Sequence, residues 1–270
     1  MPVDAFLFPL PQCANGQTYG PPLPGVCKGG KNMCGVGGGG QGGGTSFVGN
    51  PCDAGTGNKY ETEEDYQSSD GSLTFTRHYN SQLNDDVGLG QNWTSSFHKR
   101  LEINPILEAL VQGSSHVLIR QASGRSERFR CDDPGICVGD PDTKLRLSGD
   151  ATGYTLTLED SATERYDLNG RLTAETDRSG KTTIYGYDVN GDLETSTGPF
   201  GHALTLTYNA GGRLATLTAP DSGVYTYSYD ANGNLTQVEY PDTTTRIYHY
   251  EDTAYPNHLT GITDENGDRF

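Results

Sequence analysis

The strongest constraint on the fold is a repeat of 21 residues in the C-terminal part of the chain. Tyrosines recur at this spacing, and a leucine follows each of the first four tyrosines at a constant distance. The residues are Tyr166, Tyr187, Tyr208, Tyr229 and Tyr250, with Leu172, Leu193, Leu214 and Leu235. A fixed period of this length indicates an array of similar units, each of which buries its apolar face against its neighbours.

Each repeat contains two turn sequences, which predicts two strands per repeat. The first turn sequence is Asn-Gly, which supplies the positive φ angles of a tight hairpin turn. It occurs at Asn169-Gly170, Asn190-Gly191 and Asn232-Gly233, and the second turn follows at 178–180, 199–201 and 220–223. A single hairpin cannot bury an apolar face by itself. We therefore predict successive antiparallel hairpins that join into one growing sheet.

The second strand of each repeat alternates between large apolar or aromatic residues and small hydroxyl residues. Tyr225, Tyr227 and Tyr229 fall on one face of such a strand, while threonine and serine occupy the other face. This alternation predicts a packed tyrosine and leucine face and a solvent-facing threonine face. A tyrosine ladder on the solvent face would instead provide platforms for carbohydrate.

Composition divides the chain into three parts. Residues 1–49 form a leader rich in Gly, Pro and Cys, which we predict to be disordered or stapled by disulfides. Residues 50–160 are predicted to form a β-rich module that precedes the repeats, and residues 161–270 hold the repeats. Strands are expected in the module at 73–79, 96–103, 116–120, 125–130, 144–147 and 154–158, with a short helix or a further strand at 106–111. The predicted fold class is all-β.

The formal net charge of −16 excludes several kinds of partner. An acidic surface repels nucleic acid and anionic membranes, so neither is expected to bind. No apolar run approaches the roughly 18 residues of a membrane span, so no membrane insertion is expected. The N-terminus carries Asp4 and lacks a basic region, which makes it a poor signal peptide. We attribute the charge to the solubility of an exported protein.

Six cysteines indicate an oxidising compartment. They are Cys13, Cys27, Cys34, Cys52, Cys131 and Cys137. None forms a Cys-x-x-Cys pair and no histidine stands at zinc-finger spacing from them, which disfavours a zinc site. Four of them fall in the leader and just after it, which favours disulfides over buried thiols. Cys131 and Cys137 could close a small loop.

No combination of residues predicts catalysis, a cofactor or a metal. The chain lacks a Gly-x-Ser-x-Gly nucleophile turn, and its six histidines are scattered. The glycine-rich run at 37–44 lacks the Gly-Lys-Ser/Thr of a phosphate loop. The Asp188–Asp192 segment has Gly at position four, not at position six as in a calcium loop. We predict no catalytic, cofactor-binding or metal-binding residue, and therefore no enzyme.

Two further features could indicate either a functional site or a purely structural role. The acidic cluster at 61–65 could mimic a catalytic carboxylate pair, but we predict an exposed polar face. Trp93, the single tryptophan, could stack on a sugar, but we predict that it anchors the core of the module.

The repeat unit carries a resemblance to a known family. Tyr-Asp-x-Asn-Gly-x-Leu, as at Tyr166–Leu172 and Tyr229–Leu235, resembles the YD repeat of bacterial RHS proteins, insecticidal toxin-complex proteins and teneurins. Upstream, residues 50–60, 73–81 and 88–93 resemble the domain that precedes RHS repeats. The resemblance covers roughly residues 45–270, and the order of the motifs together with the constant period makes it specific.

The resemblance implies a long β-sheet that coils into a hollow shell around a C-terminal toxin. About four and a half repeats cannot close a shell, so we expect an open, curled fragment of a YD-repeat β-shell. The implied function is a non-enzymatic structural shell segment of a secreted or cell-surface bacterial protein. The implied partners are the rest of its own shell, toxin cargo, a secretion apparatus, and a cell-surface protein or glycan. The alternative is an extracellular β-repeat module that binds carbohydrate or protein.

Overall fold

The computed structural model describes residues 18–19, 27–28, 52–53, 57–104, 115–133, 135–141 and 143–270. The chain forms two compact units, Met1–Lys59 and Tyr60–Phe270. In the first unit, β1 (Thr18–Tyr19) pairs antiparallel with β2 (Cys27–Lys28), and β3 (Cys52–Asp53) pairs with Asn58 and Lys59. The disulfides predicted for Cys13, Cys27, Cys34 and Cys52 rest on side chains outside the described residues. The element expected at 106–111 also lies outside them.

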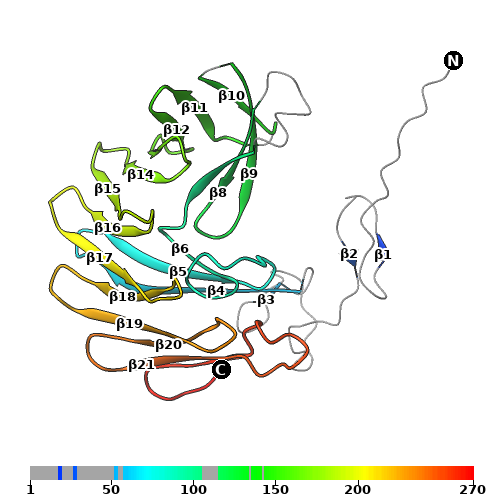
Figure 1. Cartoon of the computed structure of the whole chain (residues 1–270), viewed down its shortest axis with the longest axis vertical. Coiled ribbons are helices and arrows are strands. Elements are labelled where there is room, and N and C mark those ends of the chain that lie inside the picture. The colour runs from blue at the N-terminus through cyan, green and yellow to red at the C-terminus, as the bar shows by residue number, and fades with distance from the viewer. Residues whose placement is uncertain are drawn as a thin grey trace, which may run out of the picture. The chain divides into compact units, whose positions relative to one another are not determined.

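The second unit consists of antiparallel strands, and its described residues contain no helix (Figure 1). An inner sheet contains β4 (Asn58–Gln67), β5 (Thr74–Asn80) and β6 (Trp93–Ser95). A second sheet has the order β10-β9-β8-β7. Its strands are β7 (Arg100–Asn104), β8 (Ser115–Arg120), β9 (Ser126–Asp133) and β10 (Ile136–Gly139).

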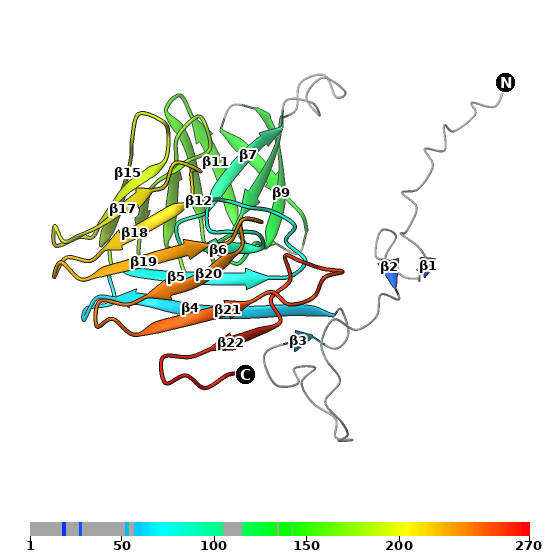
Figure 2. The ribbon, with the colours of Figure 1, turned by 60° about the horizontal axis from the view of Figure 1, so that its bottom comes forward.

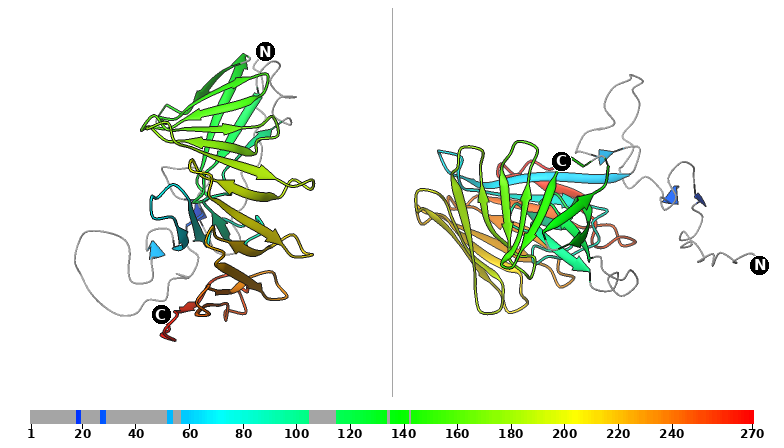
Figure 3. Two further views of the ribbon diagram at one scale, coloured as in Figure 1. Left: turned by 90° about the vertical axis from the view of Figure 1, so that its left-hand side faces the viewer. Right: turned by 90° about the horizontal axis from the view of Figure 1, so that it is seen from above.

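The largest sheet has 12 strands that pair in chain order from β11 to β22, and we call it the repeat sheet. Its strands are β11 (Arg146–Asp150), β12 (Gly153–Thr157), β13 (Thr163–Tyr166), β14 (Leu172–Thr176), β15 (Thr182–Tyr187), β16 (Leu193–Thr197), β17 (Ala203–Tyr208), β18 (Leu214–Thr218), β19 (Val224–Tyr229), β20 (Leu235–Glu239), β21 (Thr245–His249) and β22 (Gly261–Thr263). The strands follow one another along an arc, and β4–β6 lie on its inner side (Figures 1 and 3). The predicted open, curled sheet of successive hairpins is confirmed.

The predicted strands of the module are confirmed at four of six places. The segment 96–103 was expected to be one strand, but β6 ends at Ser95 and β7 begins at Arg100. The backbone N–H and the hydroxyl of Ser95 lie 3.1 and 2.7 Å from Nδ1 of His98, and this local bonding competes with a strand. The strand expected at 144–147 begins later, at Arg146. The proposed domain boundaries at 49/50 and 160/161 stay predictions.

The first turn of each repeat is wider than the predicted two-residue Asn-Gly turn. In the first repeat, Asp167 Oδ1 accepts hydrogen bonds from the backbone N–H groups of Asn169 and Arg171, at 2.9 and 2.8 Å. Only Gly170 has a positive φ, of 81°, and the strand register shifts next to Tyr166. This is a longer hairpin loop, in which a turn is followed by a left-handed glycine and a bulge. The aspartate of the repeat therefore closes the turn.

The second turn places a positive φ at one equivalent position in each repeat. That position holds Gly180, Gly201, Ser222 and Thr243, with φ of 85°, 82°, 70° and 70°. A β-branched residue is strained in this region. We expect Thr243→Gly to raise the free energy of unfolding by about 1 kcal/mol, because relief of strain exceeds the added entropy of the unfolded chain. Urea unfolding measures it, and Gly201→Thr should show the opposite sign; an equal or lower stability of Thr243→Gly would contradict the prediction.

The two faces of the repeat sheet differ as the alternation predicts. On β17, Leu204 and Leu206 are buried, whereas Thr205 and Thr207 are exposed. On β19, Tyr227 is buried between exposed neighbours. The tyrosine and leucine face is the packed one, as predicted. It forms one core with the inner sheet.

Candidate functional site

The most distinctive site is the contact between the inner sheet and the packed face of the repeat sheet (Figure 2). Aromatic rings from both sheets meet edge to face along this contact. The ring centroids of Trp93 and Tyr248 are 5.0 Å apart, and Phe75 and Phe97 pack in the same way on Tyr227 and Tyr185. Trp93 is fully buried, and its indole N–H donates to the Tyr250 hydroxyl at 2.9 Å. The prediction that Trp93 anchors the core is therefore confirmed.

A fully buried ion pair lies at the centre of this contact. Arg77 on β5 donates two hydrogen bonds to Asp65 on β4, with N–O distances of 2.7 and 2.8 Å. Arg77 also donates to the Tyr248 hydroxyl at 2.8 Å, and the Tyr227 hydroxyl donates to Asp65 at 2.7 Å. Both tyrosines belong to the repeat sheet. The pair therefore connects the two sheets through charge-assisted hydrogen bonds.

Aromatic rings enclose the Arg77 guanidinium. It lies 5.1 Å from the ring centre of Trp93 and 5.3 Å from that of Tyr248, within the range of cation–π attraction. Burial alone would lower the pKa of Arg77, but the Asp65 carboxylate raises it well above its ordinary value. Burial and the Asp65 charge also raise the pKa of Tyr227. Arg77 therefore stays charged and Tyr227 stays protonated, so both act as donors and Asp65 is the acceptor that they share.

The prediction that the acidic cluster at 61–65 forms an exposed face is wrong for three of its members. Glu61, Glu63 and Asp65 are buried, whereas Glu64 is exposed. Alternate residues of β4 face the repeat sheet, where Glu63 forms an ion pair with Arg246. Burial raises the pKa of Glu63 despite the neighbouring arginines. Two members of the cluster supply counter-charges to arginines, Asp65 to the buried Arg77 and Glu63 to the half-buried Arg246.

A second polar network joins the segment after β6 to the start of the repeats. Lys99 forms ion pairs with Glu164, at 2.8 Å, and with Glu175. The Tyr166 hydroxyl donates to Glu164 at 2.6 Å, and the Tyr185 hydroxyl donates to Glu175. Burial alone would lower the pKa of Lys99, but the two carboxylates raise it. This network holds β13, β14 and β15 to the same segment.

The segment 85–90 packs against the first turns of later repeats and bonds to them. The backbone N–H of Leu214 donates to the Gly88 carbonyl at 2.8 Å, and Arg213 forms an ion pair with Asp86 at 2.7 Å. A Cβ at Gly90 would lie 2.7 Å from the backbone nitrogen of Leu235. The glycines of this segment therefore permit a close approach of its backbone to the repeats.

The tyrosines of the repeat form a hydrogen-bond ladder that sequence reasoning missed. The hydroxyls of Tyr187, Tyr208 and Tyr229 donate to the carbonyls of Leu172, Leu193 and Leu214, at 2.7, 2.9 and 2.9 Å. Each tyrosine thus bonds to the leucine that stands 15 residues earlier, in the preceding repeat unit. The signal that could have predicted the ladder is the constant distance of 15 residues between each leucine and the next tyrosine of the repeat. The ladder explains why tyrosine, and not phenylalanine, recurs at this position.

His98 provides a pH-dependent element of the site. Burial, and next the charge of Arg100, lower the pKa of His98 to about 4, and its Nδ1 accepts the backbone N–H of Ser95. An unfolded histidine has a pKa of about 6.5, so the unfolded chain binds a proton first as the pH falls. We expect the His98 contribution to stability to be present above pH 6.5 and lost by about pH 4, a change of roughly 1–3 kcal/mol.

Urea unfolding at several pH values measures this effect. His98→Gln should flatten the slope between pH 4 and 6.5, whereas His202→Gln, at an exposed position, should leave it unchanged. An identical slope in His98→Gln and the wild-type chain would contradict the assignment.

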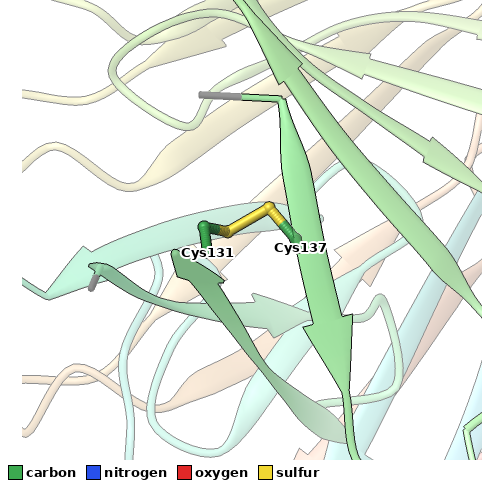
Figure 4. Close-up of a disulfide and its surroundings, with 2 residues drawn as sticks. All are labelled: Cys131 and Cys137. Carbon is green, nitrogen blue, oxygen red and sulfur yellow. A yellow bond between two sulfur atoms is a disulfide. The ribbon is translucent and has the colours of Figure 1, made fainter. Parts of the chain in front are cut away.

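Cys131 and Cys137 form a disulfide between β9 and β10 (Figure 4). The two residues are register partners in the antiparallel ladder. The small loop that the sequence allowed is therefore closed. Among the described residues no group of three His, Cys, Asp or Glu side chains could hold a metal ion. The described residues include no helix that is long and apolar enough to cross a membrane.

Comparison with known families matches two parts of the chain. Residues 49–129 match a domain of unknown function, DUF6531. Residues 166–203, 188–224, 208–245 and 229–269 each match the RHS repeat. The chain is an RHS-repeat protein. No curated protein matches it.

Two solved structures are similar to this RHS-repeat protein. One is the Tc holotoxin pore of Photorhabdus luminescens, with 16% identity and a TM-score of 0.30 over 56% of this chain. The other is a complex of TcdB2, TccC3 and Cdc42, with 15% identity and a TM-score of 0.30 over 75% of this chain. The RHS-repeat protein spans 10% and 14% of the length of those chains.

Proposed function

We propose that this chain is a non-enzymatic structural segment of the shell of a secreted or cell-surface RHS protein. In the whole protein, the shell would enclose and deliver a C-terminal toxin. The partners would then be the remaining shell and the toxin cargo. A secretion apparatus and a cell-surface protein or glycan would be further partners. The matches to the RHS repeat and to the domain that precedes the repeats support the proposal.

One observation carries the proposal. The tyrosine face of the repeats is used for packing: Tyr166, Tyr185, Tyr227 and Tyr248 are buried, and their hydroxyls bond to carboxylates or to Arg77. An exposed aromatic strip would favour a glycan-binding module instead. A tyrosine face that packs inside the protein supports a structural role for the repeats.

Sequencing of the gene downstream of the Phe270 codon tests the proposal. We expect the frame to continue into further 21-residue repeats, a self-cleaving segment and a variable C-terminal domain. A stop codon directly after Phe270 would contradict delivery of a cargo.

A further inference from the structure

One repeat departs from the others at the tip of its second turn. The equivalent tip positions hold Ser179, Phe200, Asp221 and Asp242. Asp221 and Asp242 each accept a backbone N–H within their own turn through Oδ1, at 3.0 Å. A phenylalanine cannot make this bond. The repeat at Phe200 lacks this bond and instead places an aromatic ring, 62% exposed, at the tip of the turn, where the Lys181 ammonium lies 5.3 Å from the ring centre.

The exposed ring borders a hollow of about 480 Å³. Leu73 and Pro220 line it together with Phe200, and Tyr66 on β4 contributes a second aromatic ring. The strand register shifts between Glu64 and Tyr66, which places Tyr66 on the same face as the buried Asp65. The bulge thereby aims Tyr66 at the hollow.

Polar groups with free hydrogen-bonding capacity surround the two rings. Within the described part of the chain, the Tyr66 hydroxyl and the His202 imidazole make no hydrogen bond, and both residues line the hollow. Asp70 and Asp221 also line it. Each uses Oδ1 for its own turn, which leaves Oδ2 for a ligand. Hydrogen bonds from Ser68 and Ser72 lower the pKa of Asp70 to about 2, so this carboxylate is ionised.

We propose that this hollow is a binding site for a neutral sugar ring, stacked on Phe200 and hydrogen-bonded by Tyr66, His202 and the two aspartates. An apolar floor with a few convergent polar groups is typical of small-ligand sites, and the volume lies in their range. A pyranose has an apolar face for the aromatic ring and hydroxyls at its edge for the polar rim. The two carboxylates and the net charge of −16 disfavour acidic sugars. The site goes beyond the proposed shell function. Phe200, His202 and Asp221 reach it from second turns of the repeats, and Tyr66, Asp70 and Leu73 reach it from β4 and the loop that follows β4.

Titration of the whole chain with trisaccharides tests the site. The probes are maltotriose, cellotriose and tri-N-acetylchitotriose, with trigalacturonic acid as the acidic control. Saturation-transfer NMR and calorimetry measure binding. We expect at least one neutral trisaccharide to bind, and the acidic one to bind more weakly or not at all.

Matched variants separate the hollow from unspecific contact. Phe200→Ser introduces the residue that Ser179 provides in another repeat, so the fold should persist, and affinity should fall about tenfold. Tyr66→Phe should weaken binding less, because it removes only the hydroxyl. Val189→Ser, at a fully exposed apolar residue of a first turn, should change nothing. The proposal is overturned if no neutral trisaccharide binds at about 10 mM, if Phe200→Ser binds like the wild type, or if Val189→Ser weakens binding equally.

Discussion

Replacing Arg77 with methionine is expected to lower the free energy of unfolding by about 3–5 kcal/mol. Methionine fills much of the same space, but it leaves the Asp65 carboxylate buried without its counter-charge. The hydroxyls of Tyr227 and Tyr248 lose part of the same network. Denaturant unfolding followed by circular dichroism measures the loss, and Trp93 fluorescence reports the centre of the contact.

A matched ion pair on the surface provides the control. Lys144 and Glu159 lie 3.1 Å apart and are largely exposed, so Lys144→Met should cost less than about 1 kcal/mol. A similar small loss in Arg77→Met would mean that the buried pair does not hold the two sheets together. The double variant Arg77→Met with Asp65→Leu should recover much of the stability, because removal of both charges leaves no uncompensated one.

The repeat sheet could be predicted from the sequence because its information is local and recurs. The 21-residue period fixed the number of strands per unit, and the alternation on β17 and β19 identified the packed face. The predicted length of the first turn was too short, although its position was correct. Asn-Gly indicated a turn, but the aspartate before it closes a wider loop. Local bonding between Ser95 and His98 also broke a strand that hydrophobic alternation alone had favoured.

The buried charge network could not be predicted, because its partners are distant in sequence. Arg246 stands 183 positions after Glu63, and Tyr248 stands 171 after Arg77. A run of acidic residues usually indicates a solvated face. Only the packing of β4 against the repeats shows that alternate residues of this run are buried. The hollow at Phe200 was missed for the same reason, since Tyr66 reaches it from another sheet.

A second large effect is expected where the β7 strand meets the first repeat. Gly170 has a φ of 81°, and a Cβ there would lie 2.0 Å from the Leu101 carbonyl oxygen. The backbone N–H of Leu101 in turn donates to the Gly170 carbonyl at 2.8 Å. Gly170→Ala should therefore cost about 2–5 kcal/mol, because backbone strain adds to displacement of β7.

Gly180 separates these two contributions. It has a φ of 85° in a second turn, and a Cβ there would meet no atom within 4 Å. Gly180→Ala should therefore cost only about 1 kcal/mol, from backbone strain alone. The difference between the two variants in urea unfolding measures the contact between β7 and the repeats. Equal losses would mean that β7 does not press on the first turn, and that the sheet containing β7 is not held by the repeat at this point.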